Sequence, residues 1–333
     1  MKTNHTKQLG MSLIEMMIAM TLGLLLIAMV ISVFLTSNRN YTQDDTFARL
    51  QESGRFAIDR LSSELAMAHF WGGMLNPTTN LVDNTGVAAA NKCNTTFDAT
   101  DPILIIDEAT ATEVNTAHTC IAASSVSGIG ADMLVIKRVS GTNKKDRLPN
   151  VPDDNKMMLY TDSNGKNGQL KLYDNSDYAG TGPSASEAGA WEFSPRIFFI
   201  CLQELDDTDN LVGLTAPALC VAEWSQFKSK IRPRVYVEGI EDFQVTFGID
   251  SDSDGIPDQY VAEPTSTQMI SAVTATIKVL ARSSNTVPGY VNEKSYDLGK
   301  STGVPYKPND GYYRRVFSKT VMLRNTAYLR SID

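Results

Sequence analysis

The sequence predicts an α+β architecture: one long N-terminal helix that packs on an antiparallel β-sheet head. Three patterns predict it. An uncharged apolar run occupies 16–35, apolar residues at helical spacing continue it through 47–68, and apolar and polar residues alternate over 271–281. The chain has 333 residues, of which 42% are hydrophobic and 20% charged. It is therefore long enough to bury a core.

The apolar run predicts a helix that crosses a membrane once. Met16 to Leu35 contains 20 residues without a charge, and a helix with a rise of ~1.5 Å per residue spans a ~30 Å hydrocarbon layer over that length. We assign 11–38 to this hydrophobic transmembrane and assembly helix. Lys2 and Lys7 precede it, so the positive-inside rule predicts a cytoplasmic N-terminus and a head outside the cytoplasm.

The same helix is predicted to continue as an amphipathic segment over 39–73. Its apolar positions step by three or four residues, so they share one face, as in a helix that covers a core. These positions are Phe47, Leu50, Gly54, Ile58, Leu61, Leu65 and Ala68. Gly72 and Gly73 predict its end, because glycine readily adopts the left-handed conformation that ends helices.

The remaining residues, 74–333, are predicted to form a head rich in antiparallel strands. Segments of β-branched and aromatic residues are separated there by Gly, Asn, Asp and Pro clusters. In the clearest segment the apolar Val273, Ala275 and Ile277 alternate with polar residues. One sheet face therefore meets a core, and we expect the amphipathic helix to cover it. The predicted strands are 103–107, 133–139, 170–173, 197–202, 235–237, 243–249, 271–281 and 316–323.

Four cysteines are widely spaced and form no C-x-x-C pattern, which favours disulfides in an oxidising compartment over a zinc site. Sequential pairing, Cys93 with Cys120 and Cys201 with Cys220, is the preferred one of three possible connectivities. Each bond would close a loop of ~20–30 residues and stabilise the head by roughly 3 kcal/mol. The alternative is free buried thiols.

Composition argues against two classes of function. The formal net charge of −8 repels phosphate, so nucleic acid is not expected as a primary partner. Of the three histidines only His69 and His118 lie outside the N-terminal tail, which disfavours a zinc enzyme or a Ser-His-Asp hydrolase. The chain also has no nucleophile elbow and no glycine-rich phosphate loop. We therefore predict a protein that is not an enzyme.

A carboxylate stands at the edge of the apolar stretch, where it is costly. Glu15 follows Met11 by four residues, and an acidic side chain carried to the bilayer centre costs up to ~2.5–3.5 kcal/mol. Gly10 ends a short basic segment immediately before the stretch. Glycine, spacing and carboxylate together resemble the N-terminus of the type IV prepilins.

The resemblance implies that 1–10 is a leader peptide, which a prepilin peptidase removes after Gly10 on the cytoplasmic side. It further implies N-methylation of the new amine on Met11, which stands where the family usually has Phe. In a filament, the Glu15 carboxylate of one subunit would then pair with the amine of a neighbour, as an assembly ion pair that sets register. The alternative is an uncleaved membrane anchor whose Glu lies at the interface.

The segment 250–258 matches the start of an oxygen-rich calcium loop. Aspartates at alternate positions precede Gly255, as at positions 1, 3, 5 and 6 of an EF-hand loop. The predicted calcium ligands are Asp250, Asp252, Asp254, the Ile256 carbonyl and Asp258. Position 12 is Val261 instead of Glu, and the flanks look like strands, so we expect weak to moderate affinity. The alternative is a solvated acidic turn.

Over most of its length the chain resembles the PilW-type minor pilins. The residues that carry this resemblance are 54–58 (GRFAI), 245–250 (VTFGID) and 314–318 (RRVFS). The resemblance implies a subunit that joins other minor pilins and the major pilin in an initiating or tip complex and depends on the inner-membrane assembly machinery. Before assembly the subunit would be anchored in the inner membrane with a periplasmic head, and after assembly it would be part of the pilus fibre on the cell surface. Alternatives are a calcium-dependent adhesion module at the pilus tip and a minor pseudopilin of type II secretion.

Overall fold

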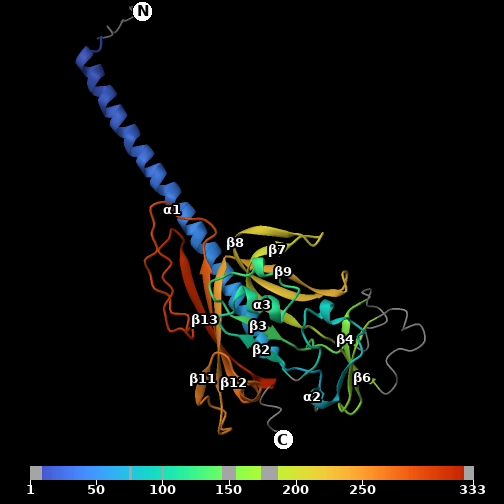
Figure 1. Cartoon of the computed structure of the whole chain (residues 1–333). Helices are drawn as coiled ribbons and strands as arrows, with labels where there is room; N and C mark the ends of the chain where they lie inside the picture. The colour runs from blue at the N-terminus through green and yellow to red at the C-terminus, as the bar shows by residue number, and fades with distance from the viewer. Residues whose placement is uncertain (1–9, 75–76, 100, 145–154, 174–186, 326–333) are drawn as a thin grey trace, which may run out of the picture. The chain divides into compact units, whose positions relative to one another are not determined.

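The structure is a computed structural model that describes residues 10–74, 77–99, 101–144, 155–173 and 187–325. The chain divides into two compact units, Met1–Ala48 and Arg49–Asp333. The long helix α1 (Leu13–Met67) begins in the first unit and ends in the second. Figure 1 follows the elements along the chain from α1 to β13.

The first part of α1, over 16–35, is apolar on all sides. A window of 18 residues within α1 has a mean hydropathy of 2.7, and none of it is buried. A helix that is apolar all round needs lipid or other helices as its surroundings, and this one is long enough to cross a membrane.

The part of α1 in the second unit buries one face. Leu50, Ala57, Leu61 and Leu65 are each at most 3% exposed and follow one another at intervals that keep them on one side of the helix. This face is the one predicted from the sequence.

Helix α1 ends at Met67, so the predicted helical segment 39–73 is six residues too long. His69 adopts a left-handed backbone conformation with φ 65°, which ends the helix before the two glycines are reached. The Asn325 side-chain amide donates a hydrogen bond of 2.9 Å to the Ala68 carbonyl, one of the groups that a helix end leaves without a helical partner.

Two antiparallel sheets form the larger part of the described head. The five-stranded sheet has the order β2 (Ile103–Ile106), β3 (Met133–Ile136), β7 (Arg196–Leu205), β8 (Leu211–Ser225) and β9 (Lys230–Glu238). The C-terminal sheet has the order β11 (Gln259–Val261), β10 (Ile240–Ile249), β12 (Ala272–Arg282) and β13 (Arg314–Met322). Neighbouring strands in both sheets are antiparallel.

A smaller sheet departs from the predicted pattern. Its order is β1 (Leu81–Asp83), β5 (Gly168–Leu172), β4 (Met157–Asp162) and β6 (Glu187–Glu192). β1 and β5 are parallel, so the prediction of antiparallel pairing is wrong for this pair. The two strands are far apart in the sequence, and no hairpin dictates their relative direction.

The short helices are α2 (Pro77–Asn80), η1 (Ala89–Lys92), α3 (Ala111–Ala117), η2 (Ala123–Ser125) and α4 (Ser266–Ile270).

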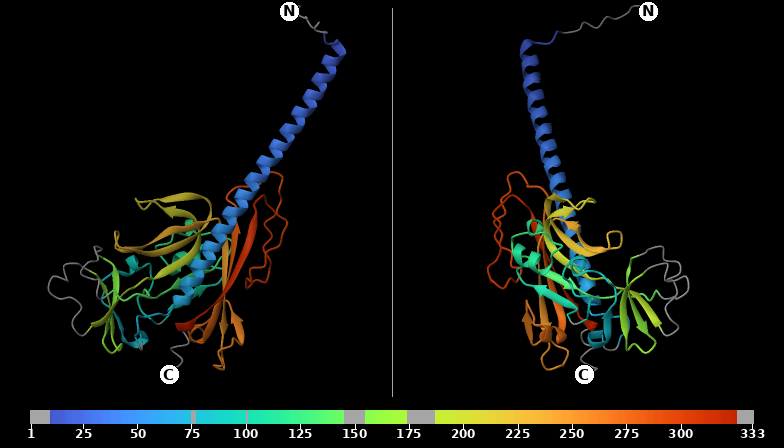
Figure 2. Two further views of the ribbon diagram at one scale, coloured as in Figure 1. Left: turned by 180° about the vertical axis from the view of Figure 1, so that it is seen from behind. Right: turned by 45° about the vertical axis from the view of Figure 1, so that its right-hand side comes forward.

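The buried face of α1 joins the two larger sheets. One core cluster contains Leu61 and Leu65 of α1, Phe198 of β7, Phe243 of β10 and Ile277 of β12. Figure 2 shows the C-terminal part of α1 running between these sheets. Burial of these side chains between the helix and the two sheets supplies the main hydrophobic stabilisation of this region.

The last strand lies directly on the first helix. A Cβ atom at Gly54 would overlap the ring of Phe317 in β13, so this close approach requires glycine. Two residues further along the strand, Lys319 Nζ pairs with Asp59 Oδ1 of α1 at 2.8 Å.

Two disulfides are present, Cys93–Cys120 with a Cα–Cα distance of 4.9 Å and Cys201–Cys220 with 5.8 Å. These are the two pairs that sequential pairing predicts. Cys201 lies on β7 and Cys220 on the adjacent strand β8, whereas the other bond ties the end of η1 to the segment after α3. Both bonds therefore reinforce the described head.

Candidate functional site

The N-terminal motif lies where α1 begins. Gly10 and Met11 precede the helix, and Glu15 falls in its first turn. The Glu15 carboxylate accepts a hydrogen bond of 3.4 Å from the Ser12 backbone N–H. A carboxylate here is favoured by the positive end of the helix dipole. Within the described ranges, no cationic side chain pairs with Glu15.

The acidic loop between β10 and β11 is organised around Asp250. Asp250 is only 1% exposed, and its two carboxylate oxygens accept hydrogen bonds from Ser253 N at 2.6 Å and Gly255 N at 3.0 Å. Ser253 and Gly255 have positive φ values of 67° and 90°, so the chain curls around this carboxylate. Gly255 thus takes the place of the sixth-position glycine in a calcium loop.

The structure brings together three of the predicted calcium ligands. Oxygen atoms of Asp250, Asp252 and Asp254 all lie within 4.8 Å of one another. Asp258 is not in this group, because its Oδ2 accepts a hydrogen bond of 2.7 Å from Ser251 N. The Ile256 backbone N–H donates to Asp254 Oδ1 at 2.7 Å. The three grouped carboxylates repel one another, and a cation held among them would relieve that repulsion.

Sequence reasoning missed two features of the described head. One is a buried ion-pair group around Glu64 of α1, and the other is a cavity between β1 and η1. Neither carries a local sequence motif. The only signal near the cavity is Cys93, whose disulfide fixes one of its walls.

Comparisons with known proteins find matches for the N-terminal motif and for the C-terminal part of the head. The family described as "Type IV Pilus-assembly protein W" matches residues 206–325, and the "Prokaryotic N-terminal methylation motif" matches residues 5–31. The second match contains Gly10, Met11 and Glu15, and the first contains the acidic loop and β13.

No curated protein matches the sequence. Among solved structures, a type IV-like pilin from Thermus thermophilus (TTHA1219) is similar at 11% sequence identity and a TM-score of 0.32, over 84% of this chain and 98% of that chain. The methylation motif and the PilW match lie in the segments that the sequence analysis singles out, and both support the predicted resemblance to the type IV pilins of the PilW type.

Proposed function

We propose that this pilin is a minor subunit that promotes type IV pilus assembly as part of an initiating or tip complex, with a structural and not a catalytic role. The observation that carries the proposal is the order of Gly10, Met11 and Glu15 at the start of a helix whose residues 16–35 are apolar on all sides. The PilW match supports the link to pilus assembly.

The proposed mechanism follows from charge burial. Removal of residues 1–10 by the prepilin peptidase would leave a cationic amine on Met11, four residues from the Glu15 carboxylate. Between apolar helices neither charge is stable alone, whereas a pair formed between neighbouring subunits satisfies both and fixes their register. Partners would be the other minor pilins, the major pilin and the inner-membrane assembly machinery.

The same proposal fixes the subunit's location. Before assembly it would span the inner membrane once, with the N-terminus in the cytoplasm and the head in the periplasm. After assembly it would be part of the pilus fibre. The two disulfides support placement of the head in an oxidising compartment.

The first test combines processing with assembly. Protein recovered from membranes that contain the peptidase is expected to begin at Met11 and to carry one methyl group, as measured by intact mass and N-terminal sequencing. Glu15→Ala is expected to leave cleavage intact but to remove most of the subunit from sheared pili, because the Met11 amine loses its partner. Glu52→Ala, at an exposed position of α1, is the control and is expected to assemble normally.

Retention of residues 1–10 in peptidase-positive cells would contradict the processing step. Normal recovery of Glu15→Ala in pili would contradict the ion pair. A deletion that stops protein secretion but leaves pili intact would instead identify a type II secretion pseudopilin.

We further propose that the acidic loop binds Ca²⁺ through Asp250, Asp252 and Asp254, with the Ile256 carbonyl and, after a local rearrangement, Asp258 as additional ligands. The support is the grouping of three carboxylates around a loop with glycine at the sixth position. Bound calcium would stiffen the loop between β10 and β11 and neutralise its charge.

Calcium is expected to raise the melting temperature of the full-length protein in detergent by several degrees. Saturation at 100 times Kd stabilises the folded state by about 2.7 kcal/mol. Asp252→Ala and Asp254→Ala are expected to abolish this increase. Asp207→Ala, an exposed aspartate in another loop, should retain it. An equal calcium response in all four proteins would exclude the loop as the binding site.

A further inference from the structure

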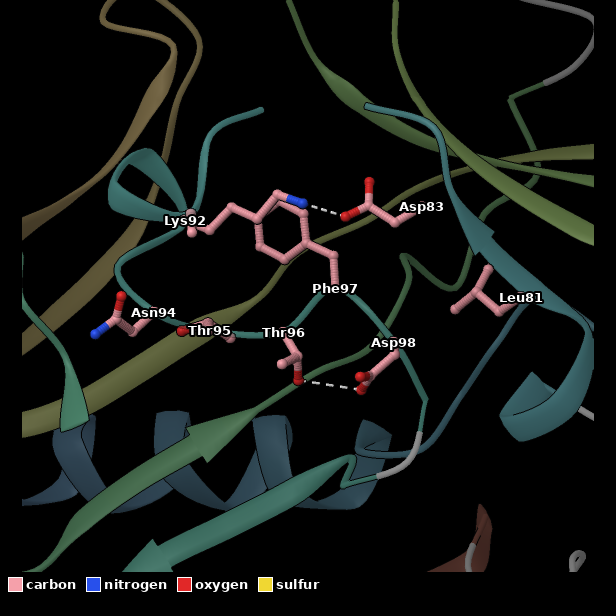
Figure 3. A pocket seen from close by; sticks show the side chains of 9 residues that line it. Leu81, Asp83, Lys92, Asn94, Thr95, Thr96, Phe97 and Asp98 are labelled. Carbon is pink, nitrogen blue, oxygen red and sulfur yellow. Dashed lines mark hydrogen bonds and ion pairs between the residues drawn. The ribbon is translucent and has the colours of Figure 1, made fainter. Parts of the chain in front are cut away.

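A concave surface lies between β1 and η1 and shares no residue with the two sites discussed above. It encloses about 450 Å³, within the range of ~300–1,000 Å³ that is usual for small-molecule sites. Figure 3 shows Lys92 extended across the ring of Phe97 toward Asp83, with Thr96 and Asp98 on the opposite side.

The charges that border this cavity cancel. Lys92 pairs with Asp83, and its ammonium lies 4.7 Å from the centre of the Phe97 ring. On the other side, the buried ammonium of Lys137 pairs with Asp98 at 2.8 Å. An anionic or cationic ligand would have to compete with one of these pairs and leave a partly buried charge without its partner. The cavity therefore favours a neutral ligand.

The wall of the cavity offers hydrogen bonds in several directions. Asn94 presents an exposed amide, which both donates and accepts. The Thr96 hydroxyl donates to Asp98 Oδ1 and accepts from Lys137 Nζ, each at 3.2 Å, and keeps one lone pair as an acceptor.

Burial alone would raise the pKa of Asp83, but hydrogen bonds from Lys92 and Thr85 outweigh it and lower that pKa. The Asp83 carboxylate is consequently ionised at neutral pH. Its Oδ1 accepts both hydrogen bonds from Thr85 and its Oδ2 pairs with Lys92, so one lone pair of Oδ2 remains for a ligand hydroxyl. Leu81 and Ala89 add apolar surface between these polar groups.

The cavity is preformed. The Cys93–Cys120 disulfide holds the chain where η1 ends, and Cys93 and Asn94 both adopt left-handed backbone conformations, with φ values of 57° and 55°. Asp83 is fixed by the Thr85 backbone N–H at 3.0 Å and the Thr85 hydroxyl at 2.7 Å. A rigid site loses little conformational entropy when it binds a ligand.

From this geometry we propose that the cavity between β1 and η1 is a binding site for a neutral saccharide. A sugar ring combines hydroxyls that both donate and accept with C–H surface, and it carries no charge. These properties match the carboxylates, amide and hydroxyl around the cavity and the apolar surface of Leu81 and Ala89. This site does not depend on calcium or on pilus assembly.

The test is a glycan array probed with the full-length protein in lipid nanodiscs. Detergents with sugar headgroups must be avoided, because they would compete for the cavity. Neutral oligosaccharides are expected to bind in preference to sialylated or sulfated ones. The best neutral glycan is then titrated against variants by saturation-transfer NMR. Ala89→Trp, which fills the cavity, is expected to remove binding. Asn94→Gly, which removes the amide and tolerates the left-handed conformation of this position, is expected to weaken binding about tenfold through one lost hydrogen bond.

Asn91→Ala is the matched control, because Asn91 is an exposed asparagine on η1 that does not line the cavity. It should bind like the wild type, and all variants should show the wild-type melting temperature. Binding of no neutral glycan, or of charged glycans only, would overturn the proposal. Unchanged binding by folded Ala89→Trp would place any saccharide site elsewhere.

Discussion

Replacement of Glu64 by glutamine is expected to lower the free energy of unfolding by about 3–5 kcal/mol. Glu64 lies on the part of α1 that enters the core and is 1% exposed. Its carboxylate accepts a hydrogen bond of 2.7 Å from Arg138 Nε, pairs with Arg196, and lies 3.2 Å from Arg60. Glutamine keeps the shape but leaves these guanidinium groups without their shared negative charge.

The pKa of Glu64 reflects the same balance. Burial by itself raises this pKa, but the hydrogen bond from Arg138 and the charges of Arg196, Arg138 and Arg60 outweigh it and lower the pKa. The folded protein therefore favours the ionised carboxylate.

Urea unfolding followed by tryptophan fluorescence, on the full-length protein in detergent, measures the loss of stability in Glu64→Gln. Glu52→Gln, at an exposed position of the same helix, should change stability by less than about 0.5 kcal/mol. A similarly small effect of Glu64→Gln would show that the buried pairs contribute little net stability.

The second large effect is a loss of stability in acid caused by His69. This residue is 7% exposed, and neither ring nitrogen has a hydrogen-bond partner among the described residues. Burial, together with the charge of Lys137, lowers the pKa of His69 to about 4. In the unfolded chain it is about 6.5. Between these values the unfolded state binds the extra proton, so stability is complete above pH 6.5 and falls as the pH drops toward 4, by up to about 3 kcal/mol.

The contribution of His69 is measured as a difference, because another buried group acts in the opposite direction. Burial raises the pKa of Asp242 to about 6 despite the nearby Lys300, so this group favours the folded state in acid. Unfolding of wild type and His69→Asn is compared from pH 7 to pH 4. Asparagine tolerates the left-handed conformation of position 69. The variant should lose less stability than the wild type over this interval, and parallel curves would show that the pKa of His69 is not lowered by folding.

The elements that could be predicted from the sequence are those with one buried face, because burial of one face imposes a regular spacing on the apolar residues. Residues 271–281 alternate because one face of β12 meets the core, and α1 shows helical spacing because one face is buried. β8 was not predicted, since its residues 216–222 are buried in succession and therefore do not alternate. Pro217 and Gly213 within β8 also argue against a strand when only the local sequence is considered.

The same limit applies to the sites. Spacing alone identified the grouped Asp250, Asp252 and Asp254, because a tight loop brings alternate residues together. It did not identify the hydrogen bond that turns Asp258 toward Ser251, which depends on side-chain orientation. The ion-pair partners of Glu64 could not be predicted from the sequence for a different reason, because Arg138 and Arg196 follow it by 74 and 132 residues. Contacts at such separations are fixed by the tertiary fold and leave no local pattern.

The contact between Phe317 and Gly54 also limits when the head can complete its folding. The last strand of the chain covers a helix near its beginning, and Lys319 and Asn325 bond to that helix across 260 and 257 residues. During synthesis, α1 emerges long before β13 exists to shield it. The head can therefore complete its folding only after β13 has been synthesised, and in the proposed periplasmic location this step follows the export of that strand.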